Sequence, residues 1–149
     1  NVHRAVHTLS EHATRAYEGS RKKVRDFLNA GHSEEIIFVR GTTEGINLVA
    51  QTYGKKTLLP GDEILITHME HHSNIVPWHF LRERHGAVLK WVPVLEDGSL
   101  DMDALQAAVG PKTKLVSVTH MSNVLGTKVD AKRATEIAHA VGAYILIDG

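Results

Sequence analysis

The chain has 149 residues, which is enough for one domain with a buried core. Hydrophobic residues make up 42% of it and charged residues 23%, as in ordinary globular domains. Its 17 basic residues balance its 17 acidic residues, so no global field favours binding to nucleic acid or to an anionic membrane. No apolar run approaches the roughly 18 residues that span a bilayer, and no secretion leader is recognisable, so we expect a cytoplasmic protein.

Two features indicate that the chain is one part of a longer protein. Its first residue is Asn1 rather than methionine, and its last residues, 144–149, read as a buried strand that stops where a loop should begin. We therefore expect a partial domain over residues 1–149, truncated at both ends. The chain contains no cysteine, which excludes disulfides and thiolate zinc sites within it.

The elements expected in the first half of the chain alternate between helices and strands. Apolar residues over 13–28 recur at near-helical spacing and predict a helix that Gly31 stops. Residues 36–39 (IIFV) predict a strand buried on both faces. An apolar stripe over residues 46–53 predicts the next helix, and residues 63–67 (EILIT) predict the next strand.

The same alternation continues to the end of the chain. The expected elements are a helix over residues 74–85, a strand over 88–94, a helix over 101–109, a strand over 115–118, a helix over 130–142 and a strand over 144–147. Asp101 and Asp130 are placed to cap two of these helices. The pattern indicates an α/β fold with a mostly parallel sheet and flanking helices. Ligands of such sheets bind beyond the carboxyl ends of the strands.

Residues 40–45 (RGTTEG) follow a predicted strand and open into a helix. Gly41 and Gly45 let the backbone approach a ligand, and the free N–H groups of a first helical turn form an anion site. Thr42 and Thr43 add hydroxyl donors; the alternative is that one threonine simply caps the helix. The segment is neither a Walker loop nor a Rossmann fingerprint, which disfavours nucleotide binding.

Residues 68–74 (HMEHHSN) form the most polar cluster of the chain. Zinc binding is disfavoured, because the helical metalloprotease pattern needs two histidines one turn apart, whereas Glu70 immediately precedes His71. We therefore expect no metal site. The flat imidazole of a histidine at a strand end can instead stack on a planar ligand. The remaining histidines of this region are expected to be surface or packing residues: His68, His72 and His79.

Two further polar residues follow predicted strands. Asn123 suits a ligand hydroxyl or phenolate, or is a turn residue that bonds its own backbone. Asp148 can hold a protonated ring nitrogen through a charge-assisted hydrogen bond, or cap whatever follows it. The strand ends together offer a phosphate cradle, a stacking ring, a hydroxyl partner and a carboxylate. One ligand that needs all four is pyridoxal 5′-phosphate, PLP.

Three long motifs strengthen this interpretation: residues 40–50 (RGTTEGINLVA), 69–78 (MEHHSNIVPW) and 120–126 (HMSNVLG). They resemble motifs of the group II (SufS-like) cysteine desulfurases and selenocysteine lyases, which belong to the class V aminotransferase superfamily. The resemblance runs in order over essentially the whole chain. It implies an N-terminal-half segment of the PLP-binding large domain of a fold type I PLP-dependent transferase.

The resemblance also implies a role for each matching residue. Thr43 would contact the PLP phosphate, and His71 would stack on the pyridine ring and assist proton transfers. Asn123 would bond the ring oxygen, and Asp148 would pair with the protonated ring nitrogen. The further positions that match the edge of the active site or the dimer interface are His3, Arg4, Arg40 and Glu44.

The activity implied by the resemblance is conversion of L-cysteine to L-alanine, with a persulfide passed to a sulfur-acceptor protein for iron–sulfur cluster assembly. L-selenocysteine is a second implied substrate, and a homodimer the implied assembly. The family's Schiff-base lysine, persulfide cysteine and substrate-binding arginine lie beyond Asp148, so we expect the segment alone to be inactive. The alternatives are another class V enzyme, kynureninase-like or epimerase-like, and a non-catalytic α/β binding module.

Overall fold

The computed structural model of the chain describes residues 2–3 and 7–149. Contacts between residues divide the chain into two compact units, residues 1–39 and residues 40–149. Helix α1 (Thr8–Leu28) dominates the first unit and is followed by the 3₁₀ turn η1 (Ser33–Glu35). Helix α1 ends at Asn29, which adopts the left-handed conformation at φ 54°, so the helix stops before the predicted Gly31.

The strand predicted over residues 36–39 is wrong for this chain. The segment is extended at Ile36, but no strand pairs with it in the described part of the chain. A strand is stable only when a neighbour satisfies its backbone N–H and C=O groups. Ile36 is buried, whereas Ile37 is 64% exposed. The apolar run is therefore genuine, but it has no sheet in which to be buried.

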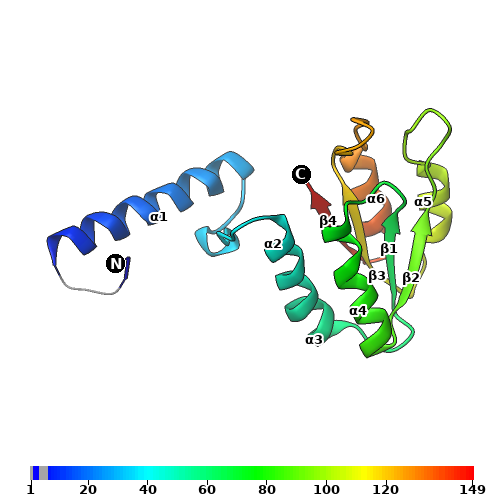
Figure 1. Cartoon of the computed structure of the whole chain (residues 1–149), viewed down its shortest axis with the longest axis horizontal. Helices are drawn as coiled ribbons and strands as arrows, with labels where there is room; N and C mark the ends of the chain where they lie inside the picture. Colours follow the sequence, from blue (N-terminus) through cyan, green and yellow to red (C-terminus); the bar gives the residue numbers. More distant parts are fainter. Residues whose placement is uncertain (1, 4–6) are drawn as a thin grey trace. The chain divides into compact units, whose positions relative to one another are not determined.

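The second unit is built on a four-stranded parallel sheet (Figure 1). The strands are β1 (Glu63–Thr67), β2 (Val88–Val92), β3 (Thr113–Thr119) and β4 (Tyr144–Asp148), in the spatial order β2-β1-β3-β4. From β1 the chain moves outward to β2, then returns across β1 to build β3 and β4 on the other side. The ends of β1 and β3 therefore flank the point where the strand order reverses, which is where open α/β sheets bind ligands.

Helices cover both faces of this sheet. They are α2 (Thr42–Val49), the π-helical turn η2 (Ala50–Gly54), α3 (Lys55–Thr57), the 3₁₀ turn η3 (His72–Asn74), α4 (Val76–His85), α5 (Met102–Ala108) and α6 (Ala131–Ala140). The side chains of Asp101 and Asp130 accept hydrogen bonds from the N–H groups of Ala104 and Arg133, so both predicted N-caps are confirmed.

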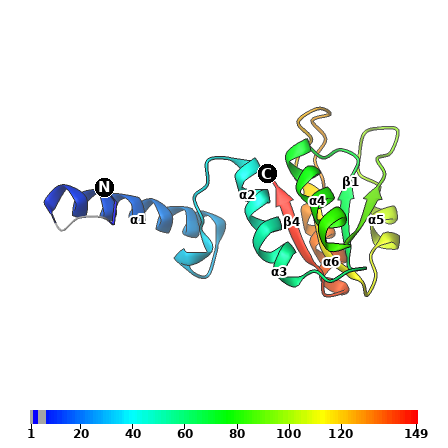
Figure 2. The same ribbon diagram turned by 60° about the horizontal axis from the view of Figure 1, so that its bottom comes forward.

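The alternation of side chains along β1 divides the core into two layers. Leu65 packs with Leu105 and Ile137, from α5 and α6. Ile64 and Ile66 point to the opposite face, where they pack in a cluster that contains Trp78 of α4. Figure 2 shows α4 and the α5–α6 pair on opposite sides of the sheet. The predicted α/β fold with a parallel sheet and flanking helices is confirmed. Over the residues that the structure describes, no helix combines the length and apolar character needed to cross a bilayer.

Candidate functional site

An open cavity of about 1220 Å³ lies at the carboxyl edge of the sheet, within the second unit. Its walls come from the start of α2, the turn after β1, the loop after β3 and the end of β4. All four residues predicted to converge line it: Thr43, His71, Asn123 and Asp148. The predicted convergence is therefore confirmed. Strand ends account for His71, Asn123 and Asp148, because parallel strands deliver their carboxyl ends to the same edge. Thr43 reaches the cavity in the first turn of α2, with no strand before it.

The first turn of α2 is available to an anion. Gly41 is its N-cap and no side chain caps this turn, so the alternative of a capping threonine is wrong. Arg40 lies beside the turn, where its Nε and its backbone N–H both donate to Glu44 Oε2, at 2.9 and 2.8 Å. These bonds, the Arg40 side chain first, lower the pKa of Glu44. Arg40 and Glu44 both line the cavity.

His71 is held with a defined ring orientation. Its Nδ1 accepts a hydrogen bond from the backbone N–H of Ser73 at 3.2 Å and lies 2.9 Å from the Ser73 hydroxyl. A backbone N–H can only donate, so Nδ1 is an acceptor and a neutral ring carries its proton on Nε2. Nε2 is therefore the ring nitrogen left for a ligand.

The other histidines of this region lie outside the cavity lining. His68 and His79 both lie beside Trp91, with ring centroids 5.4 and 6.1 Å from that of the indole, as predicted for packing residues. His72 is exposed. Among the described residues, no group of three or more histidine, aspartate or glutamate side chains is arranged to hold a metal ion.

Asp148 ends β4 directly opposite Thr119, the last residue of β3. Its backbone carbonyl accepts a hydrogen bond from the N–H of His120 at 2.7 Å, and the residue lines the cavity. Burial raises the pKa of the Asp148 carboxyl, and the nearby His71 partly opposes this shift. Its carboxylate makes no ion pair with a residue in 2–3 or 7–149, so it offers an uncompensated acceptor to a cationic ligand.

Asn123 lies exposed in the loop after β3. The alternative, in which the Asn123 side chain bonds its own backbone, is wrong, because the side chain that bonds the backbone of this turn is that of Ser122. The Ser122 hydroxyl accepts hydrogen bonds from the N–H groups of Val124 and Leu125, at 3.3 and 3.1 Å. The amide of Asn123 is thereby left free at the cavity rim.

The sequence pattern indicates Glu70 only as a metal ligand and does not predict its buried position. The side chain is buried and accepts hydrogen bonds from the Thr67 hydroxyl, the Asn74 amide and the Thr119 N–H. Burial raises the pKa of Glu70, and these three bonds oppose the shift. The four-residue spacing to Asn74 is a local signal, whereas the contact with Thr119 joins positions 49 residues apart and has none.

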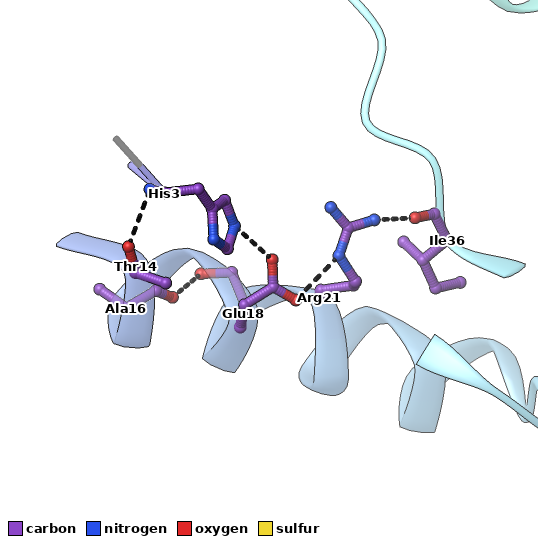
Figure 3. A network of polar contacts seen from close by, with 7 residues as sticks. His3, Thr14, Ala16, Glu18, Arg21 and Ile36 are labelled. Atoms are coloured by element: carbon purple, nitrogen blue, oxygen red, sulfur yellow. Dashed lines mark hydrogen bonds and ion pairs between the residues drawn. The ribbon is translucent and has the colours of Figure 1, made fainter. Parts of the chain in front are cut away.

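His3 belongs to a polar network of the N-terminal unit (Figure 3). Its Nε2 lies 3.1 Å from Glu18 Oε1, and its backbone N–H donates to the Thr14 hydroxyl. Glu18 also accepts from Arg21, which in turn donates to the backbone carbonyl of Ile36. The network thus joins the start of the chain to α1 and to the segment after η1. Arg4, the neighbouring candidate, lies outside the described residues.

Comparison with known proteins establishes the family. The model of the class-V aminotransferase family matches residues 1–149, and the chain therefore belongs to this family. It is 53% identical over 148 residues to a cysteine desulfurase of Pectobacterium atrosepticum, covering 99% of this chain and 36% of that protein. It is 52% identical over its whole length to a probable cysteine desulfurase of Halalkalibacterium halodurans, of which it covers 37%.

Solved structures agree with this assignment. An apo cysteine desulfurase of Thermococcus onnurineus superposes with a TM-score of 0.93 at 40% identity, covering all of this chain and 36% of that one. A cysteine desulfurase of Escherichia coli superposes with a TM-score of 0.88 at 39% identity, covering all of this chain and 37% of that one. The chain spans about a third of the length of these relatives.

Proposed function

We propose that this chain is part of the PLP-binding large domain of a cysteine desulfurase, which releases L-alanine from L-cysteine and retains the sulfur as a persulfide. The observation that carries the proposal is the cavity itself. At one rim it presents the uncapped first turn of α2, and at another the carboxylate of Asp148, which no described residue pairs with. Such a site suits one ligand that bears both a phosphate and a cationic ring. Relatives of about 50% identity that are named cysteine desulfurases support the choice of reaction.

The donor set fits PLP group by group. The free N–H groups of α2 and the Thr43 hydroxyl would hold the phosphate, since a helix N-terminus carries partial positive charge. Asp148 would accept a hydrogen bond from the protonated ring nitrogen, and the Asn123 amide would donate to the ring oxygen. His71 would lie against the ring face, with its Nδ1 already engaged by Ser73.

When bound, PLP supplies an electron sink for the negative charge that develops at the substrate Cα. In this proposal Asp148 maintains that sink, because an ionised carboxylate keeps the ring nitrogen protonated. His71 presents its Nε2–H as a hydrogen-bond donor to the groups that exchange a proton, and its ring excludes water from one side of the site. The proposed sulfur-carrying thiolate must come from another part of the protein, because these 149 residues contain no cysteine.

The proposal extends to partners and location. In this proposal a sulfur-acceptor protein takes the persulfide sulfur, for iron–sulfur cluster assembly in the cytoplasm, and L-selenocysteine is the second substrate. We further propose a homodimer whose interface or active-site edge includes His3, Arg4, Arg40 and Glu44. The ion pair of Arg40 with Glu44 at the cavity rim supports that assignment for these two residues.

Turnover by the full-length protein tests the function. With PLP, L-cysteine and a reductant, we expect equal release of alanine and sulfide from the full-length protein. The segment 1–149 alone should release neither above a PLP-only control, since it contains no cysteine to carry sulfur. A full-length protein that bound PLP but turned over kynurenine instead of L-cysteine would support the kynureninase-like alternative. Release of alanine and sulfide by the segment alone would contradict the proposal that the sulfur-carrying thiolate lies in another part of the protein.

Replacing Thr43 by alanine in the full-length apoprotein should weaken PLP binding by roughly 10- to 100-fold, the usual effect of losing a hydrogen bond to a charged group. An absorbance titration with PLP measures the dissociation constant. Thr52→Ala is the matched control, because Thr52 lies in the turn η2 that continues α2 and donates only to the Leu48 carbonyl at 2.6 Å. Equal affinities for the two variants would remove Thr43 from the phosphate site.

A further inference from the structure

The most completely bonded buried carboxylate in the described structure is that of Glu70, which does not line the cavity. Its Oε1 accepts from the Thr67 hydroxyl at 2.5 Å and from the Thr119 N–H at 3.0 Å. Its Oε2 accepts from Asn74 Nδ2 at 2.6 Å. No arginine or lysine of residues 7–149 forms an ion pair with it. Neutral donors alone therefore stabilise this buried group.

Two groups that can only donate determine the directions of the key hydrogen bonds. The Trp78 indole can only donate, and its Nε1 lies 3.0 Å from Asn74 Oδ1, which the Ser117 hydroxyl also approaches, at 2.6 Å. Asn74 Oδ1 is therefore the acceptor, and its NH₂ group must face Glu70. The Thr119 backbone N–H likewise can only donate. Both oxygens of Glu70 are thus required as acceptors, which a carboxylate provides and an amide does not.

The network connects the two sides of the cavity. Glu70 immediately precedes His71, and Asn74 ends the turn η3 whose first residues orient the His71 ring. Thr119 is the β3 residue paired with Asp148 in β4. One buried side chain therefore ties the turn that carries His71 to the strand pair that carries Asp148. It does so at the point where the strand order reverses.

We infer that Glu70 is a positioning residue, whose carboxylate sets the separation between His71 and Asp148 across the cavity. The inference rests on the proposed function for the ligand that fills this space. Glu70 touches neither cofactor nor substrate in this role, because it lies beneath the cavity lining. Its effect should therefore appear in the geometry of the bound cofactor and in kcat, with little change in KM.

Glu70→Gln in the full-length holoenzyme is the first test. An amide at this position must turn its NH₂ group either toward the Asn74 amide or toward the Thr67 and Thr119 donors. In the first orientation the new NH₂ group faces the NH₂ group of Asn74, and in the second it faces the N–H of Thr119. Two buried donors then repel each other, which should displace one side of the cavity. We expect kcat for L-cysteine to fall by roughly 10- to 100-fold, as for one buried donor left without its acceptor. KM should change by less than about 3-fold, since substrate contacts are retained, and the circular dichroism band of bound PLP should change.

Glu63→Gln is the matched control. Glu63 begins the same strand, β1, at the edge opposite the cavity, where its carboxylate lies 2.8 Å from Lys90 Nζ. The same chemical change there should lower thermal stability at most, and leave the PLP band and kcat unchanged. If Glu70→Gln behaves like Glu63→Gln, Glu70 has only a structural role and the inference is overturned.

A swap of the two side chains, Glu70→Gln with Asn74→Asp, supplies the decisive test. The exchanged pair again matches every donor to an acceptor, because the new carboxylate accepts from Trp78, Ser117 and the new amide. We expect the swap to recover the PLP band and to bring kcat within about 3-fold of wild type, since coupled neighbours compensate. Asn74→Asp alone places two carboxylates in contact and should be impaired.

Each outcome of the swap decides the matter. Recovery supports positioning by hydrogen bonds, even if Glu70→Gln by itself fails to fold. A swap that folds no better, or is no more active, than the single variant overturns the inference. Failure of the proposed function would give a different result: the wild-type protein would bind PLP but would not turn over L-cysteine. The circular dichroism band of bound PLP, compared between wild type and variants, would then still test the role of Glu70.

Discussion

Replacing Asp148 by alanine in the full-length enzyme should lower kcat for L-cysteine by roughly 100- to 1000-fold, the range found when one preorganised electrostatic group is removed. The expected cause is loss of the charge that keeps the PLP ring nitrogen protonated. Affinity for PLP should fall much less, because in the proposed site the first turn of α2 and Thr43 would hold the phosphate at the other side of the cavity. Steady-state kinetics and a PLP titration measure the two effects separately.

The pKa of Asp148 gives this prediction a pH signature. Burial raises the carboxyl pKa above its ordinary value of 3.8, so the ionised form is disfavoured in the free site. Because the folded-state pKa is raised, ionisation of this carboxyl costs more in the folded than in the unfolded protein. The free energy of unfolding of the free protein therefore falls as the pH rises from about 3.8 through the folded-state pKa. A bound ring cation reverses the sign, because it pairs with the ionised form. PLP affinity of the wild type should therefore increase with pH across this window, and the Asp148→Ala variant should lose that component.

Two variants control for the change at Asp148. Asp148→Asn keeps the shape but not the charge, so it should resemble Asp148→Ala in kcat. Asp103→Asn removes an exposed carboxylate that pairs with Arg133 at 2.9 Å and lies outside the cavity lining, and it should leave kcat unchanged. Near-normal kcat in Asp148→Ala would rule out the assigned pairing with the ring nitrogen.

Replacement of His71 by alanine should slow proton transfer at the substrate by roughly 100- to 1000-fold, the range found when one preorganised hydrogen-bond donor is removed. The same change removes the ring expected to lie on the cofactor, so the absorption spectrum of bound PLP should also shift. Stopped-flow kinetics with L-cysteine deuterated at Cα measure the step directly. We expect the isotope effect to increase in the variant, because proton removal becomes rate-limiting.

His79→Ala is the matched control for His71. His79 lies on α4, where its ring lies beside that of Trp91 and outside the cavity lining. Its loss should affect packing without altering the PLP spectrum. An unchanged spectrum and unchanged transient rates in His71→Ala would return His71 to the role of a capping residue, for which its Nδ1 bond to the Ser73 N–H is sufficient.

Local sequence patterns predicted much of the second unit. The run EILIT predicted β1 over residues 63–67, because a short apolar segment between turn signals has few other ways to be buried. Asp101 and Asp130 marked two helix starts, because a short acidic side chain satisfies free N–H groups at an N-terminus. The strand-end rule then predicted the convergence of His71, Asn123 and Asp148, since the carboxyl ends of parallel strands share one edge. Thr43 also lines the cavity as predicted, but it lies at the start of α2 and follows no strand.

Other features were decided only by contacts between distant parts of the chain. Residues 36–39 have the composition of a buried strand, but a strand also needs a neighbour, and none of the four strands pairs with them. The sequence by itself determines that a carboxylate, Glu70, directly precedes His71. Only the tertiary structure determined that Glu70 is buried and bonded to Thr119, because that contact depends on β1 and β3 lying side by side. Periodicity and capping are properties of neighbouring residues, whereas burial and strand pairing belong to the assembled sheet.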